Sequence, residues 1–181
     1  MKKLRSLLAV LILVAGFGLV APGAASADAV CPITWGSLPK ASGTTSSAPL
    51  VNVRAGWHLC FDRLVLDVKG GAPGYNVRYV SAVLAEGSGK VVPLRGGAFL
   101  SVTALVPANY PNGTPSYVPA NPRELVNVTG FLTFRQVAWA GSFESHTTIG
   151  LGVRARLPFR VFTLAGPGNL SRLVIDVAHH W

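Results

Sequence analysis

From residue 50 onward, the chain consists of short stretches in which apolar and polar side chains alternate, separated by Gly, Pro or Asn. In the clearest stretch, Leu64, Leu66 and Val68 fall on one face. Such alternation is typical of half-buried strands, and no long helical periodicity accompanies it. The pattern predicts an all-β sandwich or a partly closed barrel. The expected strands are 51–58, 61–68, 75–82, 91–94, 98–106, 125–131, 134–140, 146–157, 159–164 and 172–178, with 125–140 forming either two strands or one strand bent near Gly130.

One interval of this pattern predicts a long loop. Residues 107–122 contain five prolines and an Asn-Gly turn at 112–113. A loop of this length in a small domain is either functional or mobile. Its Tyr110 and Tyr117 either stack on sugars or pack back on the domain.

Two segments repeat each other at a distance. Residues 62–68 (DRLVLDV) match residues 171–177 (SRLVIDV) at all but the first position when Leu and Ile count as equal. We interpret them as equivalent strands of a pseudo-symmetric sandwich, although two unrelated solvent-facing edges would give the same pattern. In the first case, ion pairs could form across the strands between Arg63 and Asp176 or between Arg172 and Asp67.

The N-terminus has the three parts of a secretory signal peptide. A basic start precedes an apolar run over residues 7–20, and Ala-Ser-Ala follows at 25–27. We therefore expect residues 1–27 to be removed before Asp28. An uncleaved membrane anchor is the alternative, but the run is shorter than the roughly 20 residues that a spanning helix needs.

The remaining chain divides into an arm and a domain. We expect residues 28–49 to form an N-terminal arm or linker and residues 50–181 to form one β domain. Two cysteines in a secreted chain are expected to pair, so a Cys31–Cys60 disulfide should pin the arm to the domain. Two free buried thiols are the alternative.

The net charge limits the choice of partner. Without the signal peptide, thirteen basic residues stand against seven acidic ones. Because the chain is predicted to be exported, we expect no nucleic-acid partner. Outside the cell, a basic domain meets anionic wall polymers, lipid headgroups or acidic proteins, unless the charge only serves solubility.

An ordered set of segments carries a family resemblance. The segments are DRLVLD at 62–67, PGYNVRYV at 73–80, AGSFE at 140–144, GLGV at 150–153, FRV at 159–161 and RLVIDVAH at 172–179. In this order they resemble the AMIN-like domain of secreted actinobacterial proteins, which is a relative of the AMIN domain of bacterial cell-wall amidases. The resemblance covers roughly residues 50–181. It implies a β-sandwich that targets envelope components, is not catalytic and, without an attached amidase domain, acts as a standalone module.

The residues themselves offer no catalytic or metal-binding motif. The four histidines do not form H-x-x-x-H or H-E-x-x-H. The adjacent His179 and His180 point to opposite sides of a strand and suggest a polar C-terminal end. Asp67 and Asp176 each follow an Arg by four residues, which favours ion pairs over paired acid–base groups. We expect no enzyme activity, no cofactor and no metal.

Aromatic and Arg side chains are the candidate binding residues, because both are frequent in binding hot spots. Arg135, Val137 and Trp139 are predicted to alternate onto one face, where the Trp ring would suit stacking on a sugar. In the alternative, Trp139 belongs to the core and Arg135 is merely solvated. The full candidate set is Arg135, Trp139, Arg54, Trp57, Tyr110 and Tyr117.

The sequence thus predicts a secreted, non-catalytic envelope module that binds peptidoglycan or an associated anionic glycan. It should have no membrane span after signal cleavage, and its oligomeric state is open. The alternative is a protein-interaction module that uses the Pro-rich loop or a sheet edge. A hydrolase is the least favoured class.

Overall fold

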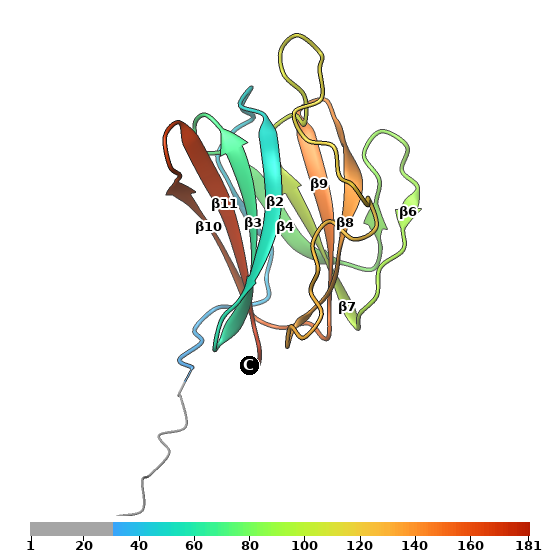
Figure 1. Ribbon diagram of the computed structural model, residues 1–181. Coiled ribbons are helices and arrows are strands. Elements are labelled where there is room, and N and C mark those ends of the chain that lie inside the picture. Colours follow the sequence, from blue (N-terminus) through green and yellow to red (C-terminus); the bar gives the residue numbers. More distant parts are fainter. Residues whose placement is uncertain (1–30) are drawn as a thin grey trace, which may run out of the picture. The chain divides into compact units, whose positions relative to one another are not determined.

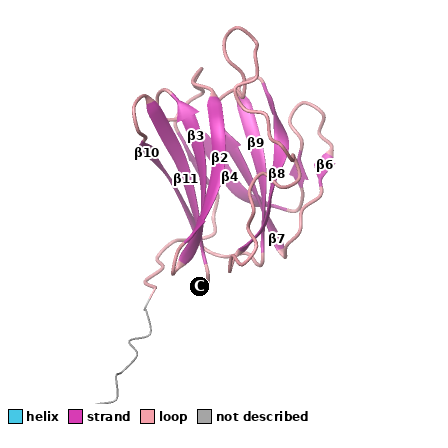
Figure 2. Ribbon diagram, viewed as in Figure 1, coloured by secondary structure: helices cyan, strands magenta, loops and turns pink. Residues whose placement is uncertain are grey.

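The computed structural model describes residues 31–181, which form two stacked antiparallel β-sheets (Figure 1). The described chain consists of strands and loops without a helix (Figure 2), which confirms the predicted all-β sandwich. The predicted signal peptide, 1–27, lies outside the described residues. The five-stranded sheet has the order β1 (Lys40–Ser42), β4 (Tyr75–Val80), β7 (Ala98–Ala104), β9 (His146–Val153) and β8 (Phe134–Phe143). The four-stranded sheet has the order β10 (Phe159–Ala165), β11 (Leu170–Ala178), β3 (Phe61–Lys69) and β2 (Leu50–Trp57).

The core lies between the inner faces of these sheets. Leu64 and Leu66 of β3 face Leu100 and Val102 of β7 across one hydrophobic cluster, and all four are fully buried. Burying each such side chain contributes roughly 1.5–3 kcal/mol. The alternation along the strands places these residues inside and leaves their sequence neighbours on the outer faces.

The two similar segments are the central strands of the four-stranded sheet. β3 and β11 pair antiparallel, and Val65 lies opposite Val174, its own counterpart in the repeat. A local twofold axis therefore runs between these two valines, which agrees with the predicted pseudo-symmetry. The alternative of two unrelated edges is wrong.

Close packing explains Gly152 of β9. A third, two-stranded sheet is formed by β5 (Val83–Leu84) and β6 (Val91–Val92). The segment after β6 crosses β9 so closely that a Cβ on Gly152 would lie 1.9 Å from the carbonyl oxygen of Arg95. Only glycine permits this approach.

Several predicted boundaries need correction. Residues 125–131 form no strand, although Leu125 donates its backbone N–H to the Val137 carbonyl of β8 and Val128 is buried. Their alternation reflects packing of an irregular segment on the core. The chain reverses after β8 at Glu144 and Ser145, which have φ values of 48° and 62°.

The disulfide-pinned arm is confirmed. Cys31 bonds to Cys60, with their Cα atoms 5.5 Å apart. Beyond the disulfide, the Gly36 carbonyl accepts the backbone N–H of Phe159 in β10, and the arm then adds β1 to the edge of β4. The arm thereby connects the two sheets along one side. Within residues 31–181, no helix has the length and hydropathy of a membrane span.

Candidate ligand-binding face

The outer face of the four-stranded sheet carries a concentration of charged side chains. Because the neighbours of core residues point outward, each of its four strands places at least one Arg or Lys on this surface. We call it the arginine face and define it by Arg54, Arg63, Lys69, Arg160, Arg172, Asp67 and Asp176. Its five cationic side chains outnumber its two carboxylates, so it attracts anions.

A buried carboxylate orients two of these arginines. Asp176 is fully buried. It accepts the Nε and Nη2 groups of Arg63 at 2.6 and 2.8 Å, and the Nε group of Arg160 at 2.8 Å. Charge-assisted bonds of this kind fix guanidinium groups firmly. Hydrogen bonding to Asp176, which outweighs burial, raises the pKa of Arg63.

Three aromatic rings surround Arg160. Its guanidinium carbon lies 4.3 Å from the Trp35 ring centre, 5.1 Å from Phe162 and 5.4 Å from Phe61. Trp35 belongs to the disulfide-pinned arm and contacts Phe61 edge-on, at 5.7 Å between centroids. In the described part of the chain, Arg160 uses only its Nε in hydrogen bonds, so both Nη groups stay available to a ligand.

A second ion pair lies further along the same face. Arg54 donates Nε and Nη2 to Asp67 at 2.8 and 2.9 Å, and this hydrogen bonding raises the pKa of Arg54. The structure thus contains the predicted Arg63–Asp176 pair but not the Arg172–Asp67 pair. Arg172 instead donates to the Ala165 carbonyl, because Arg54 already occupies Asp67.

The predicted Arg135–Trp139 surface does not form. A register shift in β8 places Arg135 on a bulge, and its guanidinium donates to the carbonyls of Phe131, Leu132 and Phe134. The ring of Trp139 packs against the core. Val137 and Trp139 share the core side as the alternation predicts, whereas the bulge takes Arg135 out of this alternation.

The remaining candidates occupy separate places. Tyr117 packs against Trp139, at 5.5 Å between ring centroids, and against the core. Tyr110 lies near Lys69 of the arginine face, whose Nζ is 5.6 Å from the ring centre. Trp57 is 52% exposed at the end of β2. Of the six predicted residues, the structure places Arg54 on the arginine face and Tyr110 beside it.

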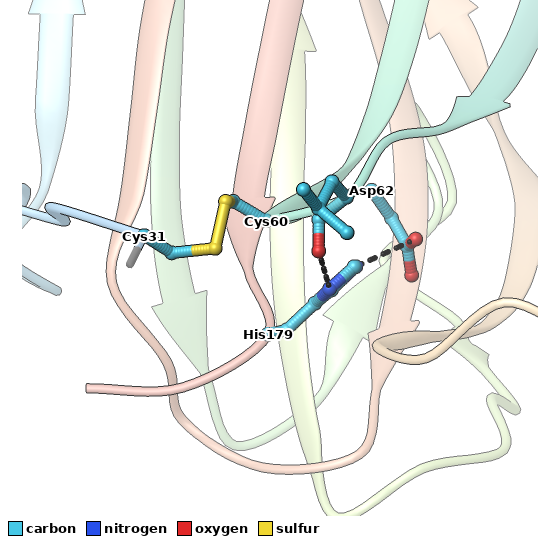
Figure 3. Close-up of a disulfide and its surroundings, with 5 residues drawn as sticks. Cys31, Cys60, Asp62 and His179 are labelled. Atoms are coloured by element: carbon cyan, nitrogen blue, oxygen red, sulfur yellow. Dashed lines mark hydrogen bonds and ion pairs between the residues drawn. A yellow bond between two sulfur atoms is a disulfide. The ribbon is translucent and has the colours of Figure 1, made fainter. Parts of the chain in front are cut away.

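A buried pair at the disulfide end is a further feature that the sequence did not reveal. Figure 3 shows Asp62 and His179 pointing toward one another beside the disulfide, with Nε2 of His179 3.0 Å from Oδ1 of Asp62. Oδ2 of Asp62 accepts the backbone N–H groups of Thr133 and Phe134 at 2.6 and 2.9 Å. The prediction of a polar C-terminal end is wrong for His179, because this side chain is buried at the end of the sandwich.

A model of the AMIN-like domain matches residues 48–179. The chain belongs to the AMIN-like family. The match spans β2 to His179 and leaves the arm with Trp35 and Cys31 outside, so this AMIN-like protein completes its aromatic cluster with a segment beyond the matched region. Membership suggests an envelope module related to cell-wall amidases. No curated protein and no solved structure matches the chain.

Sequence patterning gave only an indirect signal for the arginine face. Arg63 and Asp176 were visible through the internal repeat, whereas Trp35 and Arg160 are 125 positions apart and meet only in the folded chain. The alternation in Arg160-Val161-Phe162 is the one local signal, because it places an Arg and an aromatic side chain on the same side of a strand. Within residues 31–181, no group of three or more His, Cys, Asp or Glu side chains is placed to hold a metal ion.

Proposed function

We propose that this AMIN-like protein is a secreted, non-catalytic envelope module whose arginine face binds peptidoglycan or an anionic glycan attached to it. The observation that carries the proposal is the guanidinium of Arg160, held over Trp35 by the buried Asp176, with both Nη groups free of hydrogen bonds to residues 31–181. Planar guanidinium groups match carboxylate and phosphate oxygens, which wall polymers carry.

The fixed geometry favours binding over general charge attraction. Arg63 and Arg160 share one carboxylate, so their positions are set before a ligand arrives and less conformational entropy is lost on binding. The rings of Trp35 and Phe162 border the same position and offer apolar surface to a sugar. An open sheet face also suits an extended polymer better than a small molecule, which usually occupies a concave pocket.

Two observations support a non-catalytic role. Asp67 and Asp176 are bound in ion pairs with arginines, so neither is placed as a free acid or base. His179 faces Asp62 with Nε2 and the Leu59 carbonyl with Nδ1, so neither ring nitrogen is directed at a nucleophile as a Ser–His–Asp triad requires.

Co-sedimentation with purified cell-wall sacculi tests the proposal. The protein would be residues 28–181, which contain the whole compact unit 31–181. Arg160→Gln should weaken binding about tenfold, because it removes a charged donor from an oriented site. Arg78→Gln is the matched control, since it removes one exposed charge from β4 of the other sheet, and it should change binding less than about twofold.

Each outcome has a distinct meaning. Pelleting that survives removal of anionic polymers indicates peptidoglycan as the ligand, and pelleting lost with those polymers indicates the attached anionic glycan. Equal losses of binding in Arg160→Gln and Arg78→Gln would show that only non-specific charge attraction holds the protein to the wall. Absence of pelleting at low salt would refute the proposal.

A protein partner is the second candidate, and one observation favours it. β10 is an outer strand of its sheet, and β11 covers only one of its edges. Within residues 31–181, the backbone N–H of Phe159 bonds to the arm and the Val161 carbonyl accepts the Tyr75 hydroxyl at 3.4 Å, so the remainder of this edge, toward Ala165, could receive a partner strand. The loop 107–122 is the weaker candidate for a partner-binding site, because hydrogen bonds to Leu50 and Ser142 anchor it to the domain.

A further inference from the structure

Large apolar side chains are exposed together at the disulfide end of the sandwich. Trp57, Leu59, Leu132 and Trp181 are 52%, 60%, 50% and 69% exposed, and we call them the apolar tip. They come from the β2–β3 hairpin, the loop before β8 and the C-terminal segment. In Figure 1 the hairpin, the C-terminus and the start of the described arm lie at this same end.

Hydrogen bonds hold these three segments next to one another. His179 donates its backbone N–H to the Cys60 carbonyl at 3.0 Å, which joins the C-terminal segment to the β2–β3 hairpin. Thr133 donates its hydroxyl to the Ala178 carbonyl at 3.0 Å, which joins the loop before β8 to the same C-terminal segment. The apolar tip is therefore a fixed surface rather than four independent side chains.

Three arginines border the apolar tip. Arg135 donates to the Leu132 carbonyl at 3.2 Å, and Arg154 donates to a carbonyl of the C-terminal segment. The indole N–H of Trp181 donates to the Arg156 carbonyl at 3.1 Å. Arg154 and Arg156 are exposed, and the guanidinium of Arg156 donates to Ser37 of the arm, so both add positive charge to the segments that meet at this end.

The carboxylates of this end do not cancel these charges at the surface. Asp62 is fully buried beneath the tip. Glu124, which lines the same hollow as Arg135, is paired with Arg95. In the protein of residues 28–181, the α-carboxylate of Trp181 stands against the three arginines, so the end presents aromatic and aliphatic groups with a net positive border.

We infer that the apolar tip docks on the surface of a lipid bilayer that contains anionic phospholipid. Trp and Leu side chains enter the boundary between headgroups and acyl chains, and neighbouring arginines bind the headgroup phosphates. The positive border selects this occupant over a neutral apolar protein surface. The inference concerns a different surface from the arginine face, so the protein would have one surface for lipid and another for wall polymer.

Vesicle co-sedimentation with residues 28–181 tests the inference. Vesicles of phosphatidylglycerol and phosphatidylcholine in equal amounts should bind the protein at least about tenfold more tightly than pure phosphatidylcholine. Leu59→Asp should reduce binding to the anionic vesicles at least about tenfold, because it places a negative charge in the apolar tip. Val118→Asp is the matched control, since Val118 is 73% exposed in the loop 107–122.

The controls separate this inference from the proposed function. Leu59→Asp should leave sacculus binding unchanged, whereas Arg160→Gln should leave most of the vesicle binding. If Leu59→Asp fails to fold, Arg156→Gln is the second variant, and it should lower vesicle binding while leaving sacculus binding unchanged. Equal losses in Leu59→Asp and Val118→Asp, or absence of binding to anionic vesicles at low salt, would overturn the inference.

Discussion

Replacing Asp62 by alanine should destabilise the fold far more than replacing Asp67, whose ion-pair partner Arg54 is half exposed. One oxygen of Asp62 accepts the backbone N–H groups of Thr133 and Phe134, and the other faces His179. The alanine variant leaves both buried N–H groups without an acceptor at the point where the loop before β8 meets β3.

The size of the effect follows from these contacts. Each buried N–H group left unpaired costs about 1–3 kcal/mol, and the loss of the His179 contact adds to that. We expect Asp62→Ala to lower the free energy of unfolding by about 3–6 kcal/mol, a large share of the 5–15 kcal/mol usual for a domain. Asp62→Asn should cost at least about 2 kcal/mol less, because its amide oxygen can still accept both N–H groups.

Urea unfolding of the oxidised protein measures these differences, and hydrogen exchange at the Thr133 and Phe134 amides measures the local effect. Asp67→Ala is the control: its partner Arg54 has a side chain that is 48% exposed, so we expect a loss of about 1 kcal/mol or less. An Asp62→Ala protein within about 1 kcal/mol of the wild type, with an unchanged denaturant slope, would refute the reasoning.

Three further predictions concern the backbone and one tyrosine. Gly152→Ala should cost more than about 3 kcal/mol in urea unfolding because its Cβ would meet a backbone oxygen, whereas Gly71→Ala, with no atom within 4 Å of the added carbon, should be neutral. Replacing Glu144-Ser145 by Asn-Gly should raise the free energy of unfolding by about 1 kcal/mol, and the melting temperature with it, because both positions have positive φ in a two-residue hairpin turn. Burial raises the pKa of Tyr79 above its ordinary value of 10.0; its contribution to stability is therefore complete below about pH 10 and lost as the pH rises further. Tyr79→Phe should reduce this alkaline loss of stability, and an unchanged pH profile would contradict the assignment.

Most strands were predictable because their sequence neighbours alternate between core and solvent. β3 and β11 show this most clearly, and their similarity suggested the ion pair of Arg63 with Asp176 as one of two possibilities, of which the structure contains this one. The segment 125–131 alternates in the same way but packs on the core without joining a sheet. Alternation indicates which side chains are buried, but it does not indicate whether the backbone forms hydrogen bonds with a neighbouring strand. β1 was missed for the opposite reason, since its three residues contain no alternation.

The candidate site was harder to predict because its members meet only through the fold. Trp35 precedes β1 and Arg160 lies in β10, and the disulfide together with the bond from Phe159 to Gly36 brings them into contact. Conversely, Arg135 and Trp139 are close in sequence, but the bulge at Arg135 makes their side chains point in different directions. Spacing along a strand therefore grouped Arg135 with Trp139, which the fold separates, and could not group Trp35 with Arg160, which the fold brings together.

The position of Trp35 outside the matched region has a consequence for binding. The AMIN-like core supplies Arg63, Arg160 and Asp176, whereas the arm supplies the ring that packs on Arg160. The arm is fixed by the Cys31–Cys60 disulfide, by β1 and by the hydrogen bond from Phe159 to Gly36. On the proposed function, changes in the arm should therefore alter the ligand preference of the arginine face while the ion pairs of the core stay in place.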